Sequence, residues 1–162
     1  MTATSPVPDG MAPLRRVRTI ITVARLALPY AAFAVLKRVV PATRLARWAW
    51  TRPRPGTGAR ESATRVTNAL VALRRRRGPS RGDCLESALV LYRELSRSGA
   101  CPELVMGLGS GTGGVTGHAW VEVGGAPVGE ASDALAPFTE VARFGDHGRR
   151  VVSDIAATSR GR

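Results

Sequence analysis

Cysteine is scarce in this chain, whose 162 residues include only Cys84 and Cys101. Two cysteines are too few to hold a domain of this size together by disulfides, and their spacing matches no short metal-binding pair such as C-x-x-C. This usage fits a reducing cytoplasm. The length leaves room for one modest domain with an appendage, so we expect a cytoplasmic protein with one hydrophobic core.

Acidic residues are almost absent from the first half of the chain. Residues 1–81 carry 17 basic and 2 acidic side chains, whereas residues 82–162 carry 7 and 10. All but one of the basic residues are Arg, which can pair with carboxylates or phosphates through two parallel hydrogen bonds. The partners of the first half should therefore be acidic.

Aromatic residues are also sparse, at 5% of the chain. A non-catalytic module that binds nucleic acid through the arginines at 74–77 is one interpretation of the charge. Proteins that hold single strands stack the bases on aromatic rings, however, and no recognisable nucleic-acid motif accompanies these arginines. The sequence therefore argues against nucleic acid as the partner.

No hydrophobic run is long enough to cross a membrane. Within residues 19–40, the longest uncharged stretch runs from Leu26 to Leu36, which is 11 residues against the roughly 20 that a bilayer requires. Lys37 and Arg38 then stand where an export signal would need a small-residue cleavage site. We therefore expect neither a membrane span nor export.

The first 60 residues are predicted to precede the main domain as an extension. Residues 1–13 are rich in Pro, which predicts a disordered lead-in. Residues 14–60 are predicted to be a basic helical extension that Pro29 and Pro41 divide into short helices and that ends in a Pro-, Gly- and Arg-rich linker. This extension could cover the core, dock a partner protein or rest on an anionic membrane surface as a peripheral protein.

Residues 61–162 are the expected globular domain. A helix over residues 64–77 comes first, a second helix begins near Cys84, and short apolar runs separated by Gly follow Gly99. The runs at 104–108, 119–123 and 138–141 are strand candidates. Helices followed by an antiparallel sheet predict an α+β fold.

Cys84 lies at a predicted helix start. Asp83 stands three residues before Glu86, which is the spacing of a capping box, and apolar residues recur at helical intervals up to Leu95, with Gly99 placed to end the helix. The exposed amides and positive dipole end of a helix stabilise an anion, which favours a thiolate here. Cys84 is therefore the candidate nucleophile, the alternative being an inert buried cysteine.

His118 is the candidate general base. It lies in a predicted strand whose odd-numbered residues face the core, so it shares the other face with Trp120 and Glu122. A strand histidine that follows a helix-capping cysteine can pair with it and take its proton. The other histidine, His147, is predicted to lie in a loop.

Zinc binding is a different interpretation of the same residue types. Cys84, Cys101, His118 and His147 could supply four ligands, but their wide and even spacing is unlike that of structural zinc sites. We therefore expect no metal and no cofactor.

A third residue should orient the imidazole, and the turn after the His118 strand decides which acid can do so. If Gly124 and Gly125 form a two-residue turn, Glu130 faces away from His118 and Asp133 shares its face. If the turn has three residues and a glycine bulge, Glu130 lies on the His118 face. We predict the three-residue turn and Glu130 as the acid, with Asp133 as the alternative.

The second half of the chain carries an ordered set of motifs: C-L-E-S-A-L from Cys84, L-Y-R-E-L from Leu91, L-V-M-G from Leu104 and G-H-A-W-V-E from Gly117. The set resembles transglutaminase-like cysteine peptidases, and most closely lasso-peptide leader peptidases, over about residues 64–133. The resemblance implies a papain-like core with a Cys-His-acid triad, whose acid, usually Asp, falls at Glu130. The glycine-rich residues 109–117 depart from the family pattern and are expected to form a slack connection or a mobile lid.

The resemblance also implies an activity and a set of partners. The chain would remove the leader from a lasso precursor peptide through a thioester acyl-enzyme, while a winged-helix protein holds the leader and an ATP-using macrolactam cyclase closes the ring. Since the chain lacks room for the leader-binding domain, we expect a split system in which the basic first half docks these companions or the precursor. A transglutaminase, which uses the same triad to transfer the acyl group to an amine, is the enzymatic alternative.

Overall fold

The computed structural model describes residues 12–54, 64–70, 83–111 and 114–151. Its helices are α1 (Ala12–Leu36), α2 (Ala42–Ala49), α4 (Cys84–Arg97), the short α5 (Ser132–Leu135) and the 3₁₀ turn η2 (Asp146–Gly148), and residues 64–70 are also helical. The strands are β1 (Pro102–Gly111), β2 (Gly114–Val123), β3 (Ala126–Pro127), β4 (Phe138–Phe144) and β5 (Arg150–Val151). Within the described residues they form one antiparallel sheet in the order β3-β2-β1-β4-β5. The α+β class and the three strand candidates are confirmed.

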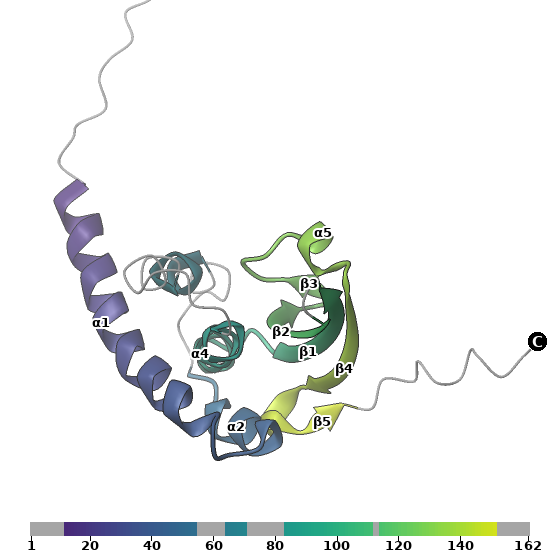
Figure 1. Ribbon diagram of the computed structural model, residues 1–162. Helices are drawn as coiled ribbons and strands as arrows, with labels where there is room; N and C mark the ends of the chain where they lie inside the picture. Colours follow the sequence, from purple (N-terminus) through teal and green to yellow (C-terminus); the bar gives the residue numbers. More distant parts are fainter. Residues whose placement is uncertain (1–11, 55–63, 71–82, 112–113, 152–162) are drawn as a thin grey trace, which may run out of the picture.

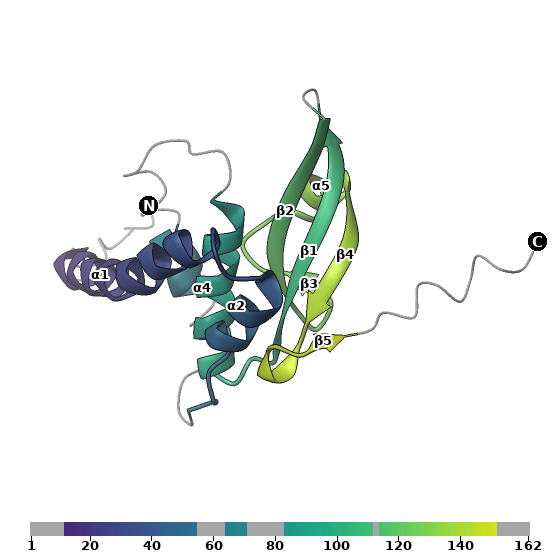
Figure 2. The ribbon, with the colours of Figure 1, turned by 60° about the horizontal axis from the view of Figure 1, so that its bottom comes forward.

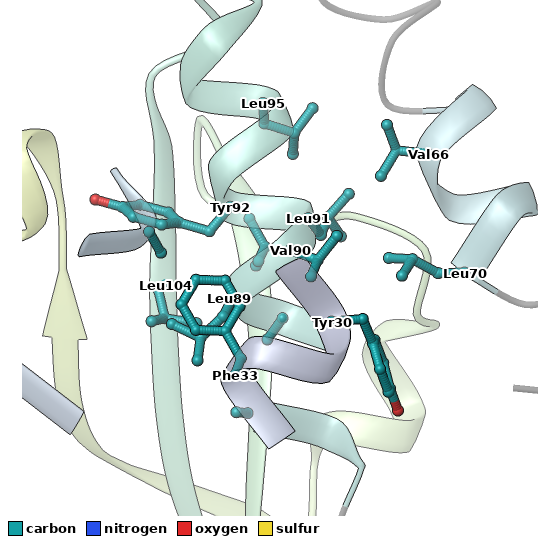
Figure 3. Packing of buried hydrophobic residues seen from close by; sticks show 14 of the residues in the cluster. Tyr30, Phe33, Val66, Leu70, Leu89, Val90, Leu91, Tyr92, Leu95 and Leu104 are labelled. Carbon is teal, nitrogen blue, oxygen red and sulfur yellow. The ribbon is translucent and has the colours of Figure 1, made fainter. Parts of the chain in front are cut away.

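The elements stack in layers with α4 in the middle (Figures 1 and 2). Helix α1 packs on one side of α4, and strands β1 and β2 pack on the other. The hydrophobic core draws side chains from each layer, including Tyr30 and Phe33 of α1, Leu89 and Tyr92 of α4, and Leu104 of β1 (Figure 3). The basic helical extension therefore shares one core with the helix that carries Cys84.

Helix α1 continues through Pro29, so the predicted division into short helices at that residue is wrong. Pro41, in contrast, directly precedes α2. A proline inside a helix removes one backbone hydrogen bond and costs about 3 kcal/mol. Leu26, Tyr30 and Phe33 are buried on both sides of Pro29, and each contributes roughly 1.5–3 kcal/mol. Burial of this face therefore outweighs the cost of the proline.

Helix α4 begins at Cys84 and is ended by Gly99, as the sequence predicts. Gly99 adopts a φ of +78°, and its N–H bonds to the carbonyl of Ser96 at 3.0 Å. The N–H of Ala100 bonds to the carbonyl of Leu95 at 3.1 Å. The two bonds form a Schellman motif, which satisfies carbonyls that the helix would otherwise leave unpaired.

The predicted capping box at the start of α4 does not form. Among the described residues Asp83 makes no side-chain capping bond, and Glu86 is instead buried and paired with Nζ of Lys37 at 2.6 Å. A second ion pair joins Nη2 of Arg25 to Oε2 of Glu94 at 2.8 Å. Together the two pairs hold α1 antiparallel along α4.

Strands β1 and β2 form one long hairpin that is in register along both strands. The glycine-rich residues 109–117 are strand on both sides of residues 112–113, so the expected loop is wrong. Close packing explains at least one of these glycines: a Cβ on Gly109 would lie 2.6 Å from the carbonyl oxygen of Pro137. Glycine at this position allows the chain before β4 to approach closely, and it does not indicate a slack connection.

Tyr92 joins α4 to the turn between β4 and β5 through hydrogen bonds. Its side chain is fully buried, and its hydroxyl donates to the carbonyl of Gly145 and accepts the N–H of Gly148 at 3.1 Å. Burial raises the pKa of Tyr92 to about 12. The neutral phenol is therefore the form that the fold requires.

Several predictions concern residues outside the described ranges and stay predictions. They are residues 1–11 of the lead-in predicted for 1–13, residues 55–60 of the linker predicted for 51–60, and the arginines at 74–77; residues 12 and 13 belong to α1, so the predicted lead-in is two residues too long. None of the helices in the described residues is both long enough and apolar enough to span a membrane.

Candidate active site

Cys84 is the first residue of α4 and lies half-buried where this helix packs against β2. Among the described residues, the first helical bond of α4 runs from the N–H of Ser87 to the carbonyl of Asp83, so the amides of Cys84, Leu85 and Glu86 form the open N-terminal end of this helix. The Sγ of Cys84 lies 4.0 Å from the carbonyl oxygen of Gly117. Because Gly117 directly precedes His118, the sulfur lies within about 7 Å of the His118 backbone nitrogen.

His118 on β2 is paired with a carboxylate. Its Nε2 lies 2.6 Å from Oε2 of Glu130, and both side chains are mostly buried, with exposed fractions of 19% and 28%. A carboxylate only accepts hydrogen bonds, so this contact places a proton on Nε2. In the neutral imidazole, Nδ1 then keeps its lone pair and can act as a base.

Two aromatic rings hold the imidazole in place. The ring centroid of Phe138, on β4, lies 4.9 Å from that of His118, and the ring of Trp120 stacks at 6.0 Å with an interplanar angle of 18°. Trp120 is itself fixed, because its Nε1 donates to Oε1 of Glu122 at 2.8 Å. The orientation of the His118 ring therefore depends on packing as well as on Glu130.

Glu130 reaches His118 by a route that the sequence analysis did not foresee. Gly124 and Gly125 form a two-residue turn with φ values of +60° and +78°, so the predicted three-residue turn is wrong. This register would carry Glu130 to the far face of the sheet if strand alternation continued. Gly129, with a φ of +79°, ends the alternation and turns the following residue back toward His118.

The other candidate residues lie in different surroundings. Asp133 is exposed on α5, where its Oδ1 accepts the N–H of Ala134 at 2.9 Å, so Glu130 is the acid that meets His118. His147 adopts a φ of +56° in η2 and packs its ring 4.0 Å from that of Trp50. Cys101 is a free, exposed thiol. In the described part of the chain, no three His, Cys, Asp or Glu side chains gather as metal ligands would.

A cluster of charges next to the site was missed by the sequence analysis. Arg143 on β4 contacts Glu140, Glu122 and Glu103 with N–O distances of 2.6–2.7 Å. The hydrogen bonds that Arg143 donates to Glu140, and then to the other two carboxylates, raise the pKa of Arg143 above its ordinary value. Alternation along β2 places Glu122 on the His118 face. Its contact with Arg143 could not be predicted in this way, because the contact depends on pairing between strands that are far apart in sequence. Through Glu122 this cluster supports Trp120 and hence the imidazole.

The fold and the site define a class: an α+β protein with a cysteine at a helix start beside a histidine–carboxylate pair on an antiparallel sheet. A family comparison agrees, because the transglutaminase-like superfamily matches residues 24–143. The chain belongs to the transglutaminase-like superfamily, whose members are typically cysteine peptidases or transglutaminases. The match begins inside α1. Comparisons with curated proteins and with solved structures gave no match.

Proposed function

We propose that this chain is a cysteine peptidase in which Cys84 is the nucleophile, His118 the general base and Glu130 the residue that orients the base. The observation that carries the proposal is the 2.6 Å contact between Nε2 of His118 and Glu130. The residue directly before His118, Gly117, has its carbonyl oxygen 4.0 Å from the Cys84 sulfur. The contact with Glu130 commits Nε2 to the carboxylate and leaves Nδ1 for the thiol. The same division of the two ring nitrogens is what a Cys-His-acid triad requires.

The reaction proceeds in two steps. Nδ1 of His118 takes the thiol proton, and the sulfur of Cys84 attacks the scissile carbonyl carbon. The carbon–nitrogen bond then breaks, the amine leaves with the proton from the imidazolium, and a thioester joins Cys84 to the acyl fragment. Water attacks the thioester with His118 again as base, which releases a carboxylic acid and restores the thiol.

The start of α4 supports this chemistry. The negative charge of the thiolate and of the oxyanion develops next to the first amides and the positive dipole end of a helix. We assign the backbone N–H of Cys84 as one oxyanion donor, since it lies at this helix end and moves with the nucleophile.

The substrate we propose is a lasso-peptide precursor, whose leader leaves as the acyl fragment. The support is the ordered set of motifs at 84–95, 104–107 and 117–122, which resembles lasso-peptide leader peptidases. On this proposal a separate winged-helix protein presents the leader, and a macrolactam cyclase consumes the freed amine. The basic first half of the chain, with 17 cationic side chains in residues 1–81, is where we propose that acidic segments of these companions dock.

The two cysteines provide a matched pair of variants. We expect purified full-length chain, incubated with precursor and leader-binding protein, to release the leader as a free acid in mass spectra. Cys84→Ala should abolish release, whereas Cys101→Ala should retain it, because Cys101 is exposed and its sulfur lies beside the carbonyl of Gly99, past the opposite end of α4 from Cys84. Leader release by Cys84→Ala would overturn the assignment.

The fate of the acyl-enzyme separates hydrolysis from acyl transfer. Adding a primary amine to the same reaction offers the thioester a competing nucleophile. A peptidase should give mainly the free acid, whereas a product made up mainly of the amide would assign the site to transglutaminase chemistry instead.

A further inference from the structure

Helix α1 is apolar on two opposite sides. Leu26, Tyr30 and Phe33 are buried against α4, whereas Leu28 and Val35 are 78% and 66% exposed. Seven residues separate Leu28 from Val35, so they lie on one helical face, nearly opposite Leu26. A surface helix normally presents polar residues on its outer side, and this one does not.

The exposed apolar face continues past the end of α1. Backbone hydrogen bonds from Lys37 to Phe33 and from Val40 to Leu36 prolong the helical course, and Val39 in this turn is 77% exposed. We call Leu28, Val35 and Val39 the outer stripe. Helix α1 forms the outer layer of the molecule, so the outer stripe faces away from α4 (Figures 1 and 2).

The charge around the outer stripe has one sign. Residues 10–60 contain eleven Lys and Arg and no Asp or Glu. Arg38 lies within the stripe and is exposed, and Arg44 and Arg47 are exposed on the following helix. Of the carboxylates near α1, Glu86 and Glu94 are each already paired with a cation, and Asp83 lies beside the buried Tyr30 on the inner side of the helix. Within the described residues 12–54, the chain has no Asp or Glu to offset these cations.

This pattern distinguishes a lipid surface from a partner helix. Helix pairs commonly fix their register with charges of both signs beside the apolar seam. A membrane surface that carries anionic lipid is uniformly negative and has no register to specify, so aliphatic side chains flanked only by Arg suit it.

We propose that the outer stripe and its flanking arginines bind the surface of an anionic lipid membrane, with α1 lying in the interface plane. This inference is independent of the proposed peptidase activity. The layer order places α1 and the sheet that carries His118 on opposite sides of α4. A membrane bound at the outer stripe would therefore leave the sheet, with its histidine–carboxylate pair, on the aqueous side.

Vesicle flotation with the full-length chain tests the proposal. We expect binding to vesicles of phosphatidylcholine with 30% phosphatidylglycerol, weak binding to phosphatidylcholine alone, and a loss of binding as salt is raised. Changing the outer stripe by Leu28→Ser, Val35→Ser and Val39→Ser should weaken binding at least tenfold. Because these side chains are exposed, the variant should keep its fold, which circular dichroism checks.

Two control variants make the test specific. Val115→Ser with Val141→Ser changes exposed apolar side chains of the sheet and should leave vesicle binding unchanged. Arg38→Gln, Arg44→Gln and Arg47→Gln should weaken binding to anionic vesicles by about fivefold for each arginine that touches the surface.

Three results in the vesicle assay would overturn the proposal. They are no binding of the wild-type chain to anionic vesicles, equal binding by the outer-stripe variant, and equal binding to neutral vesicles. If the chain is instead a dimer by light scattering and the outer-stripe variant is a monomer, a second copy occupies the stripe and the lipid proposal is rejected. Leader cleavage measured without vesicles should be the same in the wild type and the outer-stripe variant.

Discussion

Glu130 offers the sharpest test of the site, because one substitution can separate its charge from its hydrogen bond. Glu130→Gln keeps an oxygen that can accept the Nε2 proton of His118 and removes the charge. A hydrogen bond to a charged group contributes about 1.5–3 kcal/mol, against about 0.5–1.5 kcal/mol between neutral groups. Water screens a pair that is partly exposed, so we take the lower part of the difference, about 1–1.5 kcal/mol.

This magnitude converts to about a tenfold lower kcat/KM for leader cleavage by Glu130→Gln. Glu130→Ala also removes the anchor of the imidazole ring, so we expect a loss of about 100- to 1,000-fold. Asp133→Asn is the matched control, because that carboxylate is exposed and bonded to the backbone of its own helix. Its kcat/KM should stay within about twofold of the wild type.

Cleavage is measured as initial rates at substrate concentrations below KM, with unfolding followed in parallel to exclude a loss of fold. An Asp133→Asn variant as impaired as Glu130→Ala would refute the assignment of the acid. Equal rates for Glu130→Ala and the wild type would refute the role of the carboxylate altogether.

The remaining predictions concern what holds the site in shape. Tyr92→Phe should lower the free energy of unfolding in urea by about 1–3 kcal/mol, because two buried hydrogen bonds of the phenol are lost while the Gly148 N–H and the Gly145 carbonyl keep their bond to each other; a change below about 0.5 kcal/mol would contradict this. Since the folded pKa of Tyr92 is about 12 and its ordinary value is 10, wild-type stability should fall as the pH rises between these values, and less steeply in Tyr92→Phe. Gly129→Ala should slow leader cleavage at least tenfold, because the φ is +79° and a Cβ would lie 2.7 Å from Cγ2 of Thr67; an unchanged cleavage rate would be the contrary result. Lys37→Met should lower the free energy of unfolding by about 3 kcal/mol by leaving the buried Glu86 unpaired, and adding Glu86→Leu should restore most of it; urea titrations that show no restoration would reject the ion pair as the cause.

Local patterns predicted the parts of the site that depend on neighbours in sequence. Helical spacing after Cys84 and the glycine at position 99 located α4, because a helix is built from contacts three and four residues apart. Alternation in residues 119–123 located the strand and the face of His118. These are short-range properties that the chain carries within a single element.

The parts that failed depend on contacts that no single segment contains. The capping box predicted at Glu86 does not form, because Glu86 instead pairs with Lys37, 49 positions earlier in the chain. The helix break predicted at Pro29 does not occur, because the free energy gained by burying α1 against α4 outweighs the cost of the proline. The turn that leads to Glu130 was predicted by counting residues, and the count could not include the left-handed backbone at Gly129 that redirects the chain.

The helical extension has a physical consequence for the nucleophile. Two ion pairs, from Arg25 of α1 and from Lys37 directly after it, end on α4, at Glu94 in its third turn and at Glu86 in its first. The position of α4 sets the depth of Cys84 against β2, so α1 helps to set the distance between the sulfur and the histidine strand. A basic segment chosen only to attract acidic partners would need no buried face, yet α1 buries Leu26 at 1% exposure in the common core. The extension is therefore a structural layer of the site whether or not its outer surface binds lipid.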